Sequence, residues 1–198
     1  MYLEESLLNI KITAGGKAES ERLDLDIEKS IQGIIEYVPK LDFKGISYIL
    51  VTDLPLIKKG KRKNAKASYI KKNGINPAYI EVYLKNLFSH VGSVESFKLM
   101  VPIQEHGLAW ALFHEIGHHV RVSKSHSVKS TKSETFANNY ADMVMQKLIL
   151  KTSDSVKDCF THLESIAETK GLKMDTIKNM KRGWRIYLEK ARANARAY

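Results

Sequence analysis

The most restrictive feature of this sequence is a single change of hydrophobic pattern near Ser93. Before it, short β-branched and aromatic runs such as Ile46–Thr52 and Tyr79–Leu84 are separated by turn residues, as strands are. After it, apolar residues recur at helical spacing almost to the end of the chain. Strands followed by a block of helices are typical of the α+β class. The sequence therefore predicts a small, mostly antiparallel N-terminal sheet with one helix, followed by a helical half.

The predicted elements divide the 198 residues into three parts of one domain. The sheet-containing half is 1–92, with strands expected at 3–13, 46–52, 67–71 and 79–84 and a helix at 26–37. The next part, 93–150, should hold helices at 94–100, 105–121 and 132–150. A C-terminal helical extension, 151–198, should hold helices at 154–169 and 175–195.

The composition limits the kinds of site that the chain can build. Its one cysteine, Cys159, excludes an internal disulfide framework and a cysteine-rich zinc module, so any metal must use histidine and carboxylate ligands. The N-terminus lacks the basic start of a secretory signal, and no apolar run reaches the roughly 18 residues of a membrane span. We therefore expect no membrane partner and a cytoplasmic location, where a lone thiol stays reduced.

The net charge of +10 is concentrated in one stretch, residues 54–80, which contains eight basic and no acidic residues. Blocks of like charge usually form solvated loops, which is the simpler interpretation. The alternative is a surface for an anionic partner, either nucleic acid or an acidic protein. The residues that would contact such a partner are Lys58, Lys59, Lys61, Arg62, Lys63 and Lys66.

The motif that indicates chemistry is His114-Glu115-Ile116-Gly117-His118, an H-E-x-x-H sequence within a predicted helix. Residues four apart share one face of a helix, so the two imidazoles can bind one Zn²⁺. Glu115 would then act as the general base that takes a proton from the metal-bound water. Zn²⁺ is accordingly the expected cofactor.

A zinc hydrolase needs a third protein ligand, and Glu134 is the strongest candidate. It opens the next predicted helix, which can pack against the first and deliver the carboxylate. The alternative role for Glu134 is in a capping box with Thr131. Asp142 and His126, which lies in the loop, are weaker candidates for the third ligand. His119 is a poor one, because it points about 100° away from His118 around the helix.

Further residues of the second helix could support the site without binding the metal. Asn138 and Asp142 follow Glu134 by one and two turns on the same face, so either could orient a ligand histidine. The small residues Ala137 and Ala141 would allow the two helices to approach closely. The donor that stabilises the oxyanion could be Tyr140, His119 or His126, and the sequence does not choose between them.

These residues resemble a known family. His-Glu-Ile-Gly-His, followed by Glu-x-x-Ala-Asn-x-Tyr-Ala at 134–141, is similar to the pattern of the ImmA/IrrE-type metallopeptidases, a gluzincin-like group. The resemblance covers roughly 108–146. It implies a zincin-like fold, zinc on His114, His118 and Glu134, and Glu115 as general base. It also implies a cytoplasmic peptidase that cuts a regulatory protein such as a transcriptional repressor.

Two functions are therefore expected from the sequence. The first is a zinc-dependent metalloendopeptidase in a single metallopeptidase-like domain. Its substrate would pair as an added strand with the edge of the sheet, for which Tyr79–Leu84 is the candidate unless other elements cover it. The alternative is a non-catalytic, zinc-stabilised binding protein that uses residues 54–80 on nucleic acid or an acidic protein.

Overall fold

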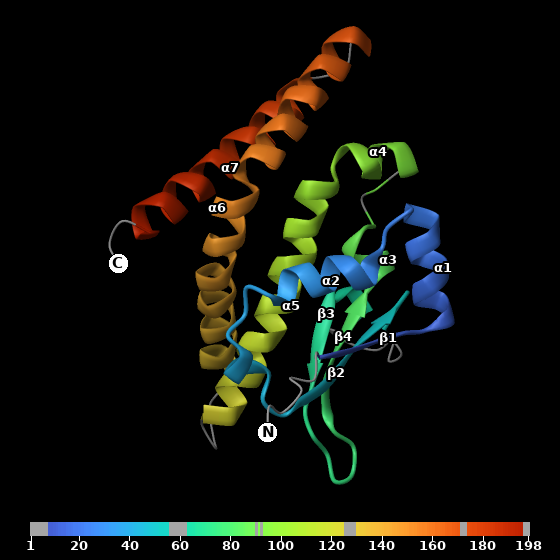
Figure 1. The fold of residues 1–198 in the computed structure, drawn as a ribbon, viewed down its shortest axis with the longest axis vertical. Helices are drawn as coiled ribbons and strands as arrows, with labels where there is room; N and C mark the ends of the chain where they lie inside the picture. The colour runs from blue at the N-terminus through green and yellow to red at the C-terminus, as the bar shows by residue number, and fades with distance from the viewer. Residues whose placement is uncertain are drawn as a thin grey trace, which may run out of the picture.

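The computed structural model describes residues 8–55, 63–89, 91, 93–124, 130–170 and 174–195, and it confirms the α+β class (Figure 1). A four-stranded sheet precedes a long helical half. The strands are β1 (Asn9–Ile12), β2 (Ile46–Thr52), β3 (Ala67–Ile70) and β4 (Ala78–Tyr83). The α-helices are α1 (Ala14–Leu23), α2 (Ile27–Ile35), α3 (Leu84–Leu87), α4 (Val94–Leu99), α5 (Val101–Lys124), α6 (Ser130–Lys170) and α7 (Met174–Ala195). A 3₁₀ helix, η1, spans Lys40–Phe43.

The sheet has the order β1-β2-β4-β3, and the prediction that it is mostly antiparallel is wrong. β1 pairs with β2 and β2 with β4 in parallel, and β3 alone runs antiparallel, on β4. The reason is the connection between β1 and β2, which contains two helices and returns the chain to the same end of the sheet. Such crossovers join parallel strands, whereas antiparallel neighbours need only a short turn.

The first of these helices, α1, was not predicted, because Gly15-Gly16 resembles the end of a strand. In the structure Thr13 caps the helix, its side-chain oxygen accepting a hydrogen bond from the Gly16 backbone N–H at 3.1 Å. A Cβ at Gly16 would lie 2.6 Å from the Val51 carbonyl oxygen, so the glycine lets α1 start directly against β2. The close packing of α1 against β2, and not a turn, explains why residue 16 is a glycine.

The position of β4 also changes the expected edge of the sheet. β4 lies between β2 and β3, so Tyr79–Leu84 cannot pair with an added strand, and that prediction is wrong. β3 is the outer strand at this side of the sheet, and it packs against α5. The edge available to a polypeptide near α5 is therefore β3.

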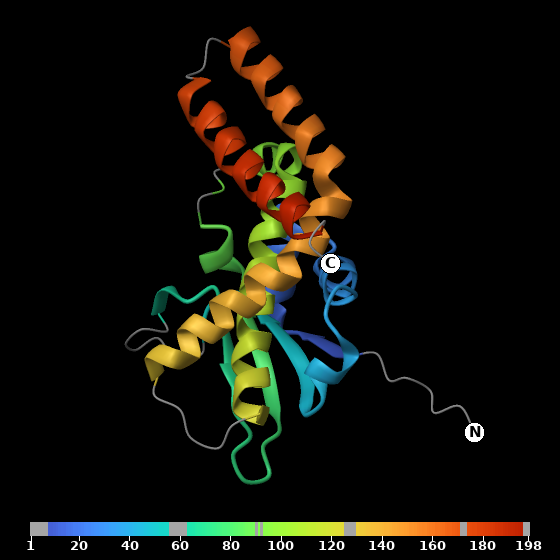
Figure 2. The ribbon, with the colours of Figure 1, turned by 90° about the vertical axis from the view of Figure 1, so that its left-hand side faces the viewer.

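The helices expected at 132–150 and 154–169 are one continuous helix, α6. The polar run Lys151-Thr152-Ser153-Asp154 suggested a break, but the Thr152 hydroxyl donates to the Leu148 carbonyl at 2.8 Å and stays within the helix. α6 and α7 form a helical hairpin whose far end projects beyond the sheet (Figures 1 and 2). The boundary predicted between the parts 93–150 and 151–198 therefore falls inside α6.

The core lies between the sheet and α5, with α2 and α6 completing it. Helical spacing on α2 buries Ile27, Ile31 and Ile34, as the sequence predicts. α5 packs against β3 and β4 on one side and against α6 on another (Figure 1). In the described residues, none of the helices is both long and apolar enough to cross a membrane.

Candidate metal centre

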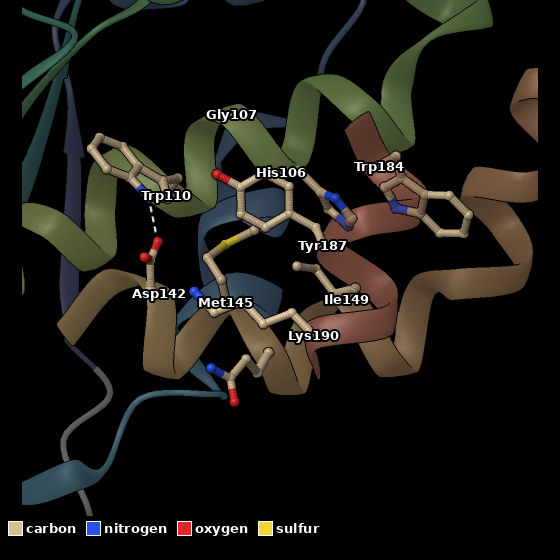
Figure 3. Close-up of a pocket in the computed structure, with 10 residues that line it drawn as sticks. His106, Gly107, Trp110, Asp142, Met145, Ile149, Trp184, Tyr187 and Lys190 are labelled. Atoms are coloured by element: carbon tan, nitrogen blue, oxygen red, sulfur yellow. Dashed lines mark hydrogen bonds between the residues drawn. The ribbon is translucent and has the colours of Figure 1, made fainter. Parts of the chain in front are cut away.

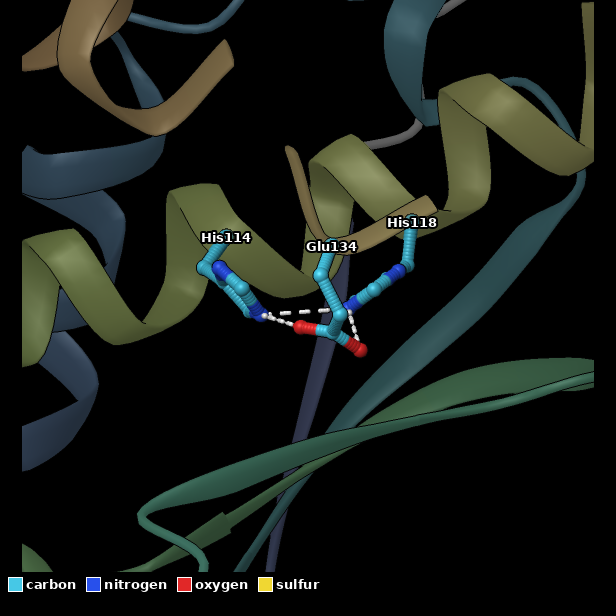
Figure 4. A group of neighbouring side chains, drawn as sticks. All are labelled: His114, His118 and Glu134. Carbon is cyan, nitrogen blue, oxygen red and sulfur yellow. Dashed lines mark hydrogen bonds and ion pairs between the residues drawn. The ribbon is translucent and has the colours of Figure 1, made fainter. Parts of the chain in front are cut away.

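Three potential ligand groups converge where α5 faces the start of α6 (Figure 4). Nε2 of His114 and Nε2 of His118 lie 3.1 Å apart. Oε2 of Glu134 lies 3.5 Å from Nε2 of His114, and Oε1 of Glu134 lies 3.5 Å from Nε2 of His118. α6 begins at Ser130, so Thr131 lies inside the helix and not at its cap, and Glu134 faces the imidazoles. The structure thus brings together the three residues that the sequence proposed as metal ligands.

The spacing of these atoms fits one metal ion. In a tetrahedral zinc site with ligands at about 2.0–2.1 Å, neighbouring ligand atoms lie roughly 3.4 Å apart. The two Nε2 atoms lie 3.1 Å apart, and each is 3.5 Å from one of the two carboxylate oxygens, which is close to this separation. One ligand atom from each residue fits within a group no wider than 4.8 Å. Glu134 is 59% exposed, whereas His114 and His118 are 14% and 17% exposed, so the group opens to solvent on the carboxylate side. A fourth position can be reached by water from that side.

The protonation of the two histidines also suits a metal. Burial lowers the pKa of His114 below its usual value, with the Glu134 charge and the Asn138 side chain opposing the shift. Burial likewise lowers the pKa of His118, and the positive charges of protonated His114 and of Lys71 act in the same direction, against Glu134. Both rings are thus neutral at neutral pH, which leaves their lone pairs free to bind a metal.

The ligand histidines are oriented by neighbours from both helices. Nδ1 of His118 lies 3.1 Å from the Ser133 hydroxyl, so the residue before Glu134 fixes a ring that Glu134 faces. Trp110 stacks on His114, with ring centroids 5.1 Å apart. Nδ1 of His114 is buried and has no hydrogen-bond partner within the described part of the chain, so Asn138 does not hold that atom. Ser133 was not predicted, because a serine before a glutamate carries no periodic signal.

Asp142 occupies a different place from the one proposed for it. Its Oδ1 accepts a long hydrogen bond, 3.4 Å, from the indole N–H of Trp110. It therefore acts on His114 only through the stacked Trp110, and it is not part of the ligand group that the described residues form.

Glu115, the proposed general base, is held by the edge strand. Its Oε2 accepts a hydrogen bond from the backbone N–H of Tyr69 on β3 at 2.6 Å. The Tyr83 N–H donates to the Lys66 carbonyl at 2.9 Å, so residues 66 and 83 form a hydrogen-bonded pair between the two antiparallel strands. Such pairs alternate along the strands with pairs that are not hydrogen-bonded to each other, which here include Ala67 and Tyr69. The backbone groups of Ala67 and Tyr69 therefore point away from β4, toward the open edge. The contact places the Glu115 carboxylate against the outer edge of β3.

The candidates for the oxyanion donor are already engaged elsewhere. His119 is 5% exposed, and its Nε2 lies 3.0 Å from the Lys44 carbonyl, which only an N–H can satisfy. Its Nδ1 then accepts from the Tyr69 hydroxyl at 3.0 Å. The Tyr140 hydroxyl donates to Asp42 at 2.7 Å, and burial with this hydrogen bond raises its pKa. His126 lies outside the described residues.

Among the described residues of the basic stretch, Lys71 acts on the candidate metal centre. Lys71 follows β3 directly, and its charge lowers the pKa of His118. Lys63 and Lys66 are exposed. Lys58, Lys59, Lys61 and Arg62 lie outside the described residues. The sequence placed the whole stretch apart from the motif, because no periodic pattern links a strand near residue 70 to a helix near residue 118.

Gly117 sets how closely the two helices approach. It lies between the ligand histidines, and a Cβ there would be 2.8 Å from Cα of Ala137 and 3.1 Å from Cβ of Tyr140. Ala137 and Ala141 on α6 are fully buried, which confirms the close helix contact expected from small residues. The close approach of α5 and α6 brings Glu134 against His114 and His118.

We expect Gly117→Ala to lower the melting temperature. Overpacking lowers the free energy of unfolding by about 1–3 kcal/mol. The higher helix propensity of alanine raises it by only about 0.8–1.0 kcal/mol. Gly183 on α7 is a matched control, because a Cβ there meets nothing within 4 Å. Gly183→Ala should raise stability by about 0.8–1.0 kcal/mol. Thermal melts of both variants check this prediction, and a rise for both would contradict the packing argument.

In comparisons with known proteins, no protein-family model, no curated protein and no solved structure matches the chain. The group His114, His118 and Glu134, which could hold a metal ion, is supported by the geometry of the chain itself.

Proposed function

We propose that the protein is a zinc-dependent endopeptidase that cleaves a protein substrate. The observation that carries the proposal is the convergence of two neutral imidazoles and one carboxylate whose ligand atoms lie within 4.8 Å of one another, open to solvent on the carboxylate side. Glu115 directly follows the ligand His114 on the same helix. Structural zinc sites are closed by four protein ligands, whereas catalytic sites keep one position for water. The resemblance to ImmA/IrrE-type peptidases supports the same reading and favours a regulatory protein as substrate.

His114, His118 and Glu134 would hold the zinc ion, which supplies a Lewis acid that polarises the scissile carbonyl and acidifies water. Glu115 then takes the proton of the attacking water on its carboxylate and passes it to the leaving amine. Ser133 and Trp110 keep the two imidazoles in position during this transfer.

The substrate backbone is expected to lie along β3. The N–H and C=O groups of Ala67 and Tyr69 face the open edge, so an extended peptide can add there as a strand. The Tyr69 N–H is bonded to Glu115, so a substrate carbonyl that takes this N–H would replace the contact between Glu115 and β3.

The test is the digestion of a mixed peptide library by the zinc-loaded chain, with new peptide ends identified by mass spectrometry. We expect cleavage that stops when a chelator removes the metal and returns when one equivalent of Zn²⁺ is added. A chain that binds zinc stoichiometrically but cleaves no peptide or unfolded protein would refute the proposal. Cleavage that persists with chelator would come from another enzyme in the preparation.

A further inference from the structure

A second feature lies beside the metal centre: an apolar pocket of about 220 Å³ between α5, α6 and α7 (Figure 3). Gly107 and Trp110 come from α5, Met145 and Ile149 from α6, and α7 forms the outer wall. The α7 residues are Trp184, Tyr187 and Lys190. Pockets that take drug-sized molecules measure roughly 300–1,000 Å³, so this one has room for a group the size of one large side chain.

The pocket continues from the metal centre along the seam between α5 and α6. On α5, residues 118, 114, 110 and 106 follow at intervals of four, and on α6, residues 134, 138, 142 and 146 do the same. At the metal end of the seam, His118 faces Glu134, and further along Trp110 meets Asp142. Trp110 belongs to both sites, because it lines the pocket and stacks on the ligand His114.

The lining favours an uncharged occupant. The lining includes His106, whose pKa is lowered to about 4 by burial and whose Nε2 lies 2.7 Å from the Thr152 hydroxyl. This histidine is neutral at neutral pH. The remaining lining is mainly aromatic and aliphatic, from Trp110, Met145, Ile149, Trp184 and Tyr187. Walls of this kind suit a bulky apolar or aromatic side chain.

We propose that this pocket receives a bulky apolar side chain of the polypeptide bound at the metal centre and thereby selects the bond that is cut. The inference rests on the proposed peptidase function and deepens it, because it defines the substrate class. Beyond the segment paired with β3, a polypeptide that leaves the metal centre along the α5–α6 seam passes Trp110 and delivers a side chain between α5 and α7. The C-terminal helix α7 thus contributes to substrate specificity.

The experiment blocks the pocket and measures cleavage preference. A Cβ at Gly107 meets nothing within 4 Å, so Gly107→Leu adds a side chain at the pocket wall without a clash. Gly183→Leu adds the same side chain to an open position on α7, outside the lining, and is the matched control. Zinc content and thermal melts of both variants verify the fold. Library digestion then gives the residue preferred at each position around the cleaved bond.

The wild-type chain should prefer Phe, Tyr, Trp, Leu or Met over Ala at one fixed position by about 10–200-fold in kcat/KM, the discrimination that apolar pockets achieve. Gly107→Leu should remove most of this preference while peptides with Ala there are still cut, and Gly183→Leu should keep it. If Gly107→Leu does not fold, Tyr187→Ala, which opens the outer wall at a residue that is 54% exposed, should weaken the same preference.

An unchanged preference in a folded, zinc-bound Gly107→Leu chain overturns the pocket inference and leaves the peptidase proposal standing. A wild-type chain that cuts peptides but prefers no apolar side chain at any position also overturns the pocket inference and leaves the peptidase proposal standing. If the wild-type chain cuts nothing, the proposed function fails, and the inference fails with it.

Discussion

A Glu115→Gln chain should keep one zinc ion per molecule and lose peptide hydrolysis by about 10²–10⁴-fold, the usual contribution of a general base. Glutamine has the shape of glutamate and can still accept the Tyr69 N–H, so the contact between α5 and β3 survives. Because the amide cannot take the proton of the attacking water, kcat should fall while zinc affinity stays unchanged. Steady-state kinetics and metal analysis on the same preparation measure both quantities.

Glu105→Gln is the control for this variant. Glu105 lies on the same helix, and its carboxylate accepts a hydrogen bond from Ser30 at 2.9 Å, away from the ligand group. Its replacement should leave hydrolysis within a few-fold of wild type. Equal rates for wild type and Glu115→Gln would exclude Glu115 as the base, even if the zinc site itself were correct.

The second large effect is expected from Glu134→Ala, which removes a carboxylate that faces both imidazoles. Losing a residue that only orients a ligand typically costs about 10–100-fold in metal affinity, so losing a ligand should cost more than that. A bound metal stabilises the folded chain by about 2.7 kcal/mol at one hundred times its Kd. Zinc should therefore raise the melting temperature of the wild-type chain and not that of Glu134→Ala.

Asn139→Ala provides the comparison for Glu134→Ala, because Asn139 is an exposed residue on the same helix and outside the ligand group. Its zinc affinity and its zinc-induced rise in melting temperature should match those of the wild-type chain. Titration with a competing zinc chelator gives the affinities. A Glu134→Ala chain with wild-type affinity would mean that another residue is the third ligand.

The ligand group could be predicted from sequence because its geometry is local. His114 and His118 share a helix face by their spacing alone, and Glu134 needs only one loop between two adjacent helices. The partners of His119 and Tyr140 could not be predicted in this way. His119 contacts Lys44 and Tyr69, and Tyr140 contacts Asp42, which lie 50 to 98 residues away in the chain.

The sheet shows the same division between local and distant information. β2 was predicted at its observed bounds, 46–52, because a β-branched run is a local signal. The parallel pairing of β1 with β2 depends on α1, a helix that has two glycines in its first turn and carries little helical periodicity. The position of β3 at the edge depends on where β4 inserts, and neither strand encodes that order in its own residues.

The most direct test of the metal centre is the coordination of zinc in the purified chain, measured by X-ray absorption or by anomalous diffraction from a crystal. We expect one zinc ion bound by Nε2 of His114, Nε2 of His118 and the Glu134 carboxylate at about 2.0–2.2 Å, with a water in the fourth position. A zinc ion closed by four protein ligands, or a chain that binds no zinc at stoichiometric concentration, would contradict the account.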